Sequence, residues 1–396
     1  MEIFIMGSSK SRSYFALAMG TLAMMVCFMV WLSLAPMIDI ILKNAGVQVS
    51  ELQRSLLLAT PILLGSIMRI PMGIMSDRFG GKKTYIILML FLIIPVLMIP
   101  RVHSYGMLVF TALLLGMSGT SFAIGVSYVT RFFPPEKQGL VLGIAGVGNI
   151  GTAFSSFFFP RWVKVIDLNG VFYVLIGLLV LFIILLLFSP ESETNKNASI
   201  VASLSVAKER DTWLLALFYF LTFGMFMSMT NLLSTFMVGL FNDSLVDAGL
   251  WAALFAVIGT LVRPVGGYLS DKIRPMSLLR YDFILIIIAA VVLGIFLETK
   301  GIFTTIIVAL AVLVGLGNGI IFKMVPFVSS GNTGAVTGFV GAMGGLGGYF
   351  PPIILGLIKQ MTGSYKIGIY LIAIFGIICL VLLQKIYISG SRRIVS

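Results

Sequence analysis

Residues 65–78 read GSIMRIPMGIMSDR, and residues 259–272 read GTLVRPVGGYLSDK. Both stretches fit the pattern G-[ST]-x-x-R-x-x-x-G-x-x-S-D-[RK], at an offset of 194 residues. Each places an arginine, Arg69 or Arg263, inside an apolar segment and ends that segment on an acid followed by a base. The pattern indicates a chain of two related halves, each with a charged side chain in an apolar helix.

The composition indicates a membrane protein. Of the 396 residues, 59% are hydrophobic and 11% are charged, whereas a soluble domain carries about 45–50% apolar and about 25% charged residues. The core of a soluble protein cannot bury so many apolar side chains, so lipid has to cover much of the surface. Cys27 and Cys379 lie in long apolar runs and His103 has no ligand-forming neighbours, so we expect no disulfide, no metal and no cofactor.

Twelve apolar segments are long enough to cross a hydrocarbon core of about 30 Å, which takes roughly 20 helical residues. The runs are continuous rather than alternating, which excludes a closed barrel. We therefore predict an all-α membrane protein with twelve transmembrane helices in two pseudo-symmetric six-helix bundles. The predicted spans are 14–36, 54–76, 84–100, 106–130, 139–160, 169–188, 211–238, 247–270, 278–297, 302–326, 334–358 and 366–387.

The net charge of +12 does not indicate a nucleic-acid binder, because a binder gathers its Lys and Arg on one face. Here they fall in the short loops between apolar runs. The side that holds both termini would carry sixteen of them and the opposite side seven, with the other four in or at the start of helices. Since positive loops stay in the cytoplasm, we expect a multi-pass protein of the cytoplasmic membrane with both termini inside.

The longest polar stretch divides six predicted helices from six. It begins with the linker-like PESETNKN at residues 190–197. We predict an N-terminal bundle at 1–188, a cytoplasmic linker at 189–210 and a C-terminal bundle at 211–396. Matching motifs in the second helix of each half are typical of the parallel repeats of secondary transporters.

Arg69 and Arg263 are the strongest candidates for function. An arginine at the centre of a bilayer costs from about 2.5 to well above 10 kcal/mol, depending on the method, so it has to face a polar cavity or a partner. The alternative is a structural ion pair with a buried acid, but the nearest acids, such as Asp77, Asp271 and Asp282, are expected at helix ends. Two arginines near the repeat interface would leave uncompensated positive charge at mid-membrane, and a guanidinium suits a planar oxyanion.

Glycine-rich stretches form the second feature, at 143–151 and at 334–348. Small residues let helices pack closely, and this alone accounts for most of the glycines. The same residues are candidate hinges where close helices slide, namely Gly146, Gly148, Gly151, Gly344, Gly345 and Gly347. Asn149 is an isolated amide among glycines, either a ligand of the cavity or a helix–helix hydrogen bond.

Other side chains could complete the cavity. Phe122, Tyr219 and Phe223 could wall it, with Tyr219 and Phe223 four residues apart on one helix face, although core packing or lipid contact explains most phenylalanines here. Lys323 lies within GNGIIFKMVP at residues 317–326. It either extends to the membrane surface or contributes to the cavity, where it would be a candidate coupling group.

The acid–base pairs that follow the two arginines lie in predicted cytoplasmic loops. These pairs are Asp77 with Arg78 and Asp271 with Lys272. We expect them to latch the two bundles together by charge contacts in one state of the protein, rather than to touch a substrate.

The loop DRFGGKK at residues 77–83 resembles the signature of the major facilitator superfamily. A closer resemblance is to its nitrate/nitrite porter family, whose two signature stretches are similar to GVGNIG at 146–151 and to GAMGGLGGYFPP at 341–352. The resemblance covers essentially the whole chain. It implies that nitrate is clamped between Arg69 and Arg263.

The resemblance also implies a role for four uncharged residues. Tyr219 would donate a hydrogen bond to the anion, Asn149 would bind it, and Phe122 and Phe223 would stack on it. The stretch 317–326 is similar to the shorter branch of the family, which is associated with proton symport, whereas the longer branch is associated with nitrate/nitrite exchange.

Several alternatives stay open at this point. Proton symport, exchange that extrudes nitrite, and a carrier for another small or organic anion all fit the sequence. An enzyme is not expected, because the chain offers no HExxH motif, no carboxylate pair within the membrane and no Walker loop, which also argues against ATP-driven transport. A sensor is not expected because no loop is long enough for an output domain. We expect nitrate, nitrite, protons and lipid as partners, and a monomer.

Overall fold

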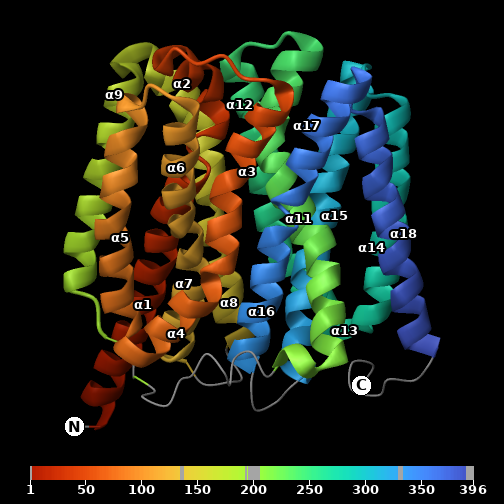
Figure 1. The fold of residues 1–396 in the computed structure, drawn as a ribbon. Coiled ribbons are helices and arrows are strands. Elements are labelled where there is room, and N and C mark those ends of the chain that lie inside the picture. Colours follow the sequence, from red (N-terminus) through yellow and green to blue (C-terminus); the bar gives the residue numbers. More distant parts are fainter. Residues whose placement is uncertain (1, 134–137, 192–193, 195–205, 329–332, 389–396) are drawn as a thin grey trace.

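The computed structural model describes residues 2–133, 138–191, 194, 206–328 and 333–388. In these residues every regular element is a helix, as the sequence predicted. The helices stand side by side, with the start of α1 (Glu2–Trp31) and the end of α18 (Lys366–Ile388) at the same end of the bundle (Figure 1). We call this the terminal end and the opposite one the far end. Of the predicted linker at 189–210, residues 192–193 and 195–205 lie outside the described residues.

The first half contains α1 and the elements that follow it up to the linker. These are η1 (Ala35–Met37), α2 (Ile38–Ala45), α3 (Glu51–Ile67), α4 (Arg69–Phe79), α5 (Gly81–Met98), η2 (Ile99–Arg101), α6 (Tyr105–Leu115), η3 (Gly116–Thr120), α7 (Ser121–Thr130), α8 (Gln138–Gly146), η5 (Val147–Ile150) and α9 (Gly151–Leu187).

The second half contains the remaining elements up to α18. These are η6 (Val206–Lys208), α11 (Arg210–Phe241), α12 (Leu245–Leu261), α13 (Arg263–Lys272), α14 (Pro275–Ile295), α15 (Lys300–Val328), α16 (Thr333–Leu346) and α17 (Phe350–Thr362).

The described residues contain the twelve membrane-spanning segments, or crossings, that the sequence predicted. Ten helical runs are long and apolar enough to span a membrane, and the bent pair α3 and α4 makes an eleventh. The longest run, Val141–Leu187, has 47 residues and would measure about 70 Å as one straight helix, over twice the thickness of the hydrocarbon core. The backbone at Asp167 is not helical (φ 59°, ψ −176°), and the chain turns back there at the far end (Figure 1).

The sequence predicted a longer connection between the spans 139–160 and 169–188, but the structure has only the turn at Asp167. Instead, α9 runs through most of that connection as helix. Asp167 then accepts a hydrogen bond from the backbone N–H of Gly170 at 2.8 Å, which is how a helix N-cap satisfies one of the free donors of the next turn. A single capping residue therefore suffices to reverse the chain.

Two crossings are interrupted directly before the arginines of the repeated pattern. The pair α3 and α4 is bent by 40° at Met68, and α12 gives way to α13 at Val262. From the sequence, both crossings were expected to be unbroken helices. Pro71 and Pro264 explain the difference, since each lacks the N–H that would bond to the carbonyl four residues earlier. Arg69 and Arg263 are thus the first residues of their helical segments.

The two halves touch through two pairs of crossings. On one side α3 packs against α16 and α17, and on the other α9 packs against α12. The approach is close, because a Cβ atom at Gly249 would lie 2.2 Å from the carbonyl oxygen of Ser156. Near the far end, the Asn231 amide of α11 donates a hydrogen bond of 2.8 Å to the Leu58 carbonyl of α3. The halves are therefore joined toward the far end.

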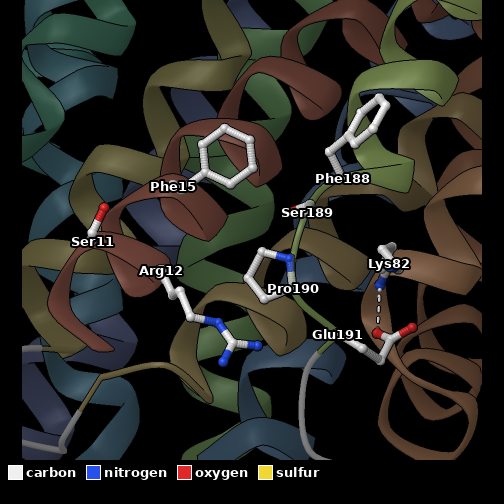
Figure 2. Close-up of a pocket in the computed structure, with 8 residues that line it drawn as sticks. All are labelled: Ser11, Arg12, Phe15, Lys82, Phe188, Ser189, Pro190 and Glu191. Atoms are coloured by element: carbon white, nitrogen blue, oxygen red, sulfur yellow. Dashed lines mark hydrogen bonds between the residues drawn. The ribbon is translucent and has the colours of Figure 1, made fainter. Parts of the chain in front are cut away.

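At the terminal end, the DRFGGKK loop is held by the start of the linker. Glu191 accepts hydrogen bonds from the backbone N–H groups of Lys82 (3.0 Å) and Lys83 (3.3 Å) in the first turn of α5, as Figure 2 shows for Lys82. A carboxylate is favourable at this position because the helix N-terminus carries partial positive charge. Gly80 allows the approach, with a φ of 97° and no side chain in the space that Glu191 fills.

The position of the two ends predicts a labelling pattern. Thr194, near the terminal end, and Asp247, at the far-end start of α12, are both exposed, while the two native cysteines are buried. In intact cells, a membrane-impermeant thiol reagent should label Asp247→Cys and should not label Thr194→Cys, because we expect from the loop charges that the terminal end lies in the cytoplasm. Labelling of Thr194→Cys in sealed cells would contradict this orientation.

Candidate functional site

Arg69 is buried in the centre of the bundle without an acidic partner. Its side chain is 1% exposed, and no ion pair among the described residues involves it. Its Nη1 donates to the Gly341 carbonyl of α16 at 2.5 Å and its Nε to the Gly119 carbonyl of η3 at 3.3 Å. Its Nη2 is buried and, among the described residues, has no hydrogen-bond acceptor. Arg69 therefore keeps a full positive charge with one set of donors unused.

Arg263 occupies the equivalent place in the second half. Its Nη2 donates to the Tyr219 hydroxyl at 2.8 Å, which holds it against α11. Its Nη1 is buried and has no acceptor within the described part of the chain. The second half therefore presents a feature similar to that of the first, a half-buried guanidinium with one buried nitrogen that is not hydrogen-bonded.

The two guanidiniums converge on the ring of Phe223. The Cζ atoms of Arg69 and Arg263 each lie 5.5 Å from the centre of this ring, so the sum of these distances, 11 Å, is the upper limit of their separation. The ring of Tyr219 stacks on Phe223 at 4.8 Å and 8°. Since an aromatic face attracts a cation, Phe223 stabilises both charges while adding no counter-charge.

Three further aromatic rings complete the surroundings. Phe122 and Trp31 lie 5.2 and 5.3 Å from Cζ of Arg69, and Phe322 lies 6.0 Å from Cζ of Arg263. Phe122 and Phe322 also meet edge to face across the two halves, at 6.0 Å. The charges thus lie in an aromatic enclosure whose walls come from both halves.

A cavity of about 330 Å³ connects Arg69 with the terminal end. Arg69 and Phe122 line its inner part, and Asp77 and Arg131 line its outer part, where their side chains are 37% and 24% exposed. Because the halves are joined toward the far end, this cavity opens at the terminal end, and Arg69 lies at its inner wall.

Asn149 lies in η5, where the first glycine-rich stretch tightens into a 3₁₀ turn. It is fully buried, and both polar atoms of its amide lack a hydrogen-bond partner among the described residues. The helix–helix hydrogen bond considered from the sequence is therefore not formed by any described pair. An unpartnered buried amide costs about 1–3 kcal/mol, which favours a ligand for it.

The candidate hinge glycines pack closely, with one exception. A Cβ at Gly344 would lie 2.1 Å from the Tyr219 ring, and one at Gly345 2.2 Å from Ser66 Oγ. Gly347 meets α11 in the same way, and Gly148 and Gly151 meet α1. Gly146 has open space beside it. Bare backbone at Gly344 and Gly345 lets α16 approach both α11 and α3, which brings the Gly341 carbonyl to Arg69.

A sequence profile described as the Major Facilitator Superfamily matches residues 20–333. The chain belongs to the major facilitator superfamily. Within it, the chain is 37% identical over 360 residues to a nitrite extrusion protein of Bacillus subtilis (strain 168), covering 90% of both chains. It is 34% identical over 380 residues to a probable nitrate transporter, NarT, of Staphylococcus haemolyticus (strain JCSC1435), covering 96% of this chain and 98% of that one.

Solved structures of this superfamily share the fold. A bacterial homolog of the human lysosomal transporter Spinster superposes with a TM-score of 0.72 at 15% identity, covering 96% of this chain and 97% of the other. The human organic anion transporter MFSD10 gives a TM-score of 0.68 at 16% identity, with 95% and 99% covered. The likeness at such low identity extends to the arrangement of the helices alone.

The charged residues after the two arginines form similar contacts in the two halves of this transporter fold. Asp77 pairs with Arg131 of the α7 end at 2.8 Å, and Asp271 pairs with Lys323 of α15. Arg78 lies over the Phe79 ring and Lys272 over the Tyr268 ring. Each of these contacts joins residues of one half, and in this conformation the ion pairs of Asp77 and Asp271 link helices within a half rather than the two halves.

Some features of the site were not expected from the sequence. The sequence does not distinguish Trp31 and Phe322 from the many other aromatic residues of the chain. Only the position of Phe322 next to Lys323 could have pointed to it. Asp282 was expected at a helix end, but α14 begins at Pro275 and the side chain is 5% exposed. Lys323 was considered for the cavity with the arginines; its ammonium instead pairs with Asp271, and its side chain is 40% exposed.

Replacing Asn149 separates a ligand-binding role from a packing role. Asn149→Leu should raise the melting temperature of the anion-free protein, because it removes an unpartnered buried amide, and should reduce its stabilisation by nitrate in a thermal-shift assay. Asn44→Leu is the matched control, since the Asn44 amide donates to the Pro100 carbonyl at 3.1 Å and its loss should lower the melting temperature. A less stable Asn149→Leu that nitrate still stabilises fully would assign Asn149 to packing.

Proposed function

We propose that this chain is a secondary transporter that carries nitrate and nitrite across the cell membrane by alternating access. The observation that carries the proposal is the pair of guanidiniums, of buried Arg69 and half-buried Arg263, which face one aromatic ring and each keep one buried nitrogen without an acceptor among the described residues. The names of the relatives, a nitrite extrusion protein and probable nitrate transporters, support the same substrates.

The chemistry of the site favours a small planar oxyanion. A guanidinium offers parallel N–H donors in one plane, which match the oxygens of a planar anion. The free donors, Nη2 of Arg69 and Nη1 of Arg263, would bind such an anion from two sides while Phe223 and Phe122 stack on it. Tyr219 and Asn149 would add a hydroxyl and an amide. A single anion neutralises part of the charge that the enclosure otherwise leaves uncompensated.

Alternating access follows from the arrangement of the halves. We place the terminal end in the cytoplasm, so the cavity that reaches Arg69 describes an inward-open state. The bundles 1–188 and 211–396 would rock about the arginines, with the close contact of Gly345 with Ser66 of α3 as a sliding surface between them. The pairs Asp77–Arg131 and Asp271–Lys323 would keep each bundle rigid. We propose that the chain works as a monomer embedded in lipid.

The energy source is either a proton or a counter-anion. An anion that enters alone is opposed by the negative interior at about 2.3 kcal/mol per charge per 100 mV. Symport with at least one proton removes this cost, and exchange of nitrate for nitrite avoids it. We propose symport, with exchange as the alternative. Lys323, which pairs with Asp271 of α13, stays a candidate for a part in this coupling.

Substitution of the two arginines tests the proposal. Arg69→Lys and Arg263→Lys should each abolish nitrate counterflow in proteoliposomes, because an ammonium keeps the charge but loses the planar pair of donors. Arg101→Lys is the control: this arginine is exposed and bonds to Tyr173, so transport should persist. Near-normal counterflow by either site variant would show that the anion is not held between these two side chains.

A further inference from the structure

A carboxyl group lies buried in the second half, away from every ion pair of the described residues. Asp282 is the eighth residue of α14, and its side chain is 5% exposed. Both carboxyl oxygens are inaccessible, and neither has a hydrogen-bond partner among the described residues. An ionised carboxylate in such a place would lack both water and a counter-charge, which is far costlier than a neutral acid. The acid therefore holds a proton in this conformation.

The groups on the neighbouring helices do not compensate Asp282. The helices packed against α14 are α13, α15 and α18, and α11 adjoins it through the contact of Phe218 with Phe283. Within the described part of the chain, none of the titratable side chains of these helices is hydrogen-bonded or ion-paired with Asp282. They are Arg280 and Tyr281 of α14 itself, Arg210, Asp211 and Tyr219 of α11, Arg263, Tyr268, Asp271 and Lys272 of α13, Lys300 and Lys323 of α15, and Lys366, Tyr370, Cys379 and Lys385 of α18.

Gly317 of α15 and Thr222 of α11 form the space that receives the carboxyl. A Cβ at Gly317 would lie 2.5 Å from Asp282 Oδ2 and 2.7 Å from Thr222 Cγ2, so these two atoms are at most 5.2 Å apart, the sum of both distances. Thr222 directly precedes Phe223. The acid therefore lies beside α11, the helix whose Tyr219 and Phe223 contact the two guanidiniums.

We propose that Asp282 is the site that takes up the proton carried together with the anion. The inference rests on the proposed nitrate transport and identifies its coupling group. The empty guanidinium pair attracts a negative carboxylate and so favours loss of the proton, whereas a bound anion cancels this attraction and favours its uptake. Proton and anion binding promote one another, and this linkage is reciprocal.

One turn of the cycle is balanced in charge and protons. In the outward-open state, the Asp282 carboxylate takes one proton from outside as one nitrate binds between the arginines. In the inward-open state nitrate leaves first, while Asp282 still holds its proton as in the conformation described above; the guanidiniums then favour its ionisation, and the carboxyl releases the same proton to the cytoplasm. One nitrate and one proton enter together, with no net charge moved by this step.

Asp282→Asn tests the proposal because the amide has the size of the acid and stays neutral. Proteoliposomes with the variant should show no nitrate-driven lumenal acidification, followed with a pH-sensitive dye, while nitrate/nitrite counterflow should continue at the wild-type rate. Asp247→Asn, at an exposed aspartate of the far end, is the matched control and should acidify the lumen as wild type does.

Nitrate binding to the purified protein gives a second readout. In wild type, the nitrate Kd should rise with pH across the range in which Asp282 ionises, by up to about tenfold per pH unit for one linked proton. In Asp282→Asn the Kd should be independent of pH in that range.

The outcomes distinguish a failure of the Asp282 inference from a failure of the proposed nitrate and nitrite transport. Acidification by Asp282→Asn at the wild-type rate overturns the inference, and so does a loss of counterflow in a variant that still binds nitrate. Wild-type counterflow without any nitrate-driven acidification favours exchange and also overturns it. If wild type performs no nitrate/nitrite counterflow at all, it is the proposed function that fails.

Discussion

The structure depends on keeping two guanidinium groups charged inside an apolar bundle. Each has exchanged water for backbone carbonyls, a tyrosine hydroxyl and aromatic faces, and neither has an acidic partner among the described residues. Cation–π contacts contribute about 0.5–2 kcal/mol each, less than the desolvation of a buried ion, which is several kcal/mol after relaxation. A bound anion would offset the part of the desolvation cost that these contacts leave uncompensated.

Many local features of the fold serve this arrangement. The interruptions before Arg69 and Arg263 start a new helical segment at each arginine, and the glycines of α16 bring the Gly341 carbonyl within 2.5 Å of Arg69. This hydrogen bond crosses from the first half to the second. An anion that binds Arg69 from the other side would change the contact that joins the halves, which couples occupancy of the site to the relative position of the bundles.

The sequence predicted the parts of this account that rest on strong local signals. Twelve apolar runs and a repeated arginine are visible without a structure, because lipid tolerates few charges and each one is conspicuous. The sequence predicted a longer connection in place of the turn at Asp167, because a turn made by a single capping residue leaves no break in the hydropathy of the chain. Asp282 was misplaced because moving the start of α14 from residue 278 to Pro275 carries its carboxyl further into the bundle. The contacts of Trp31, Phe322 and Lys323 depend on packing between distant helices, which periodicity cannot supply.

An experimental structure of the protein with bound nitrate tests the central claim most directly. The account predicts density for one planar anion within hydrogen-bond distance of both Nη2 of Arg69 and Nη1 of Arg263, with the Phe223 ring beside it. If both nitrogens bond instead to protein groups while nitrate lies elsewhere, or if the anion contacts only one guanidinium, the paired arginines are not the substrate site.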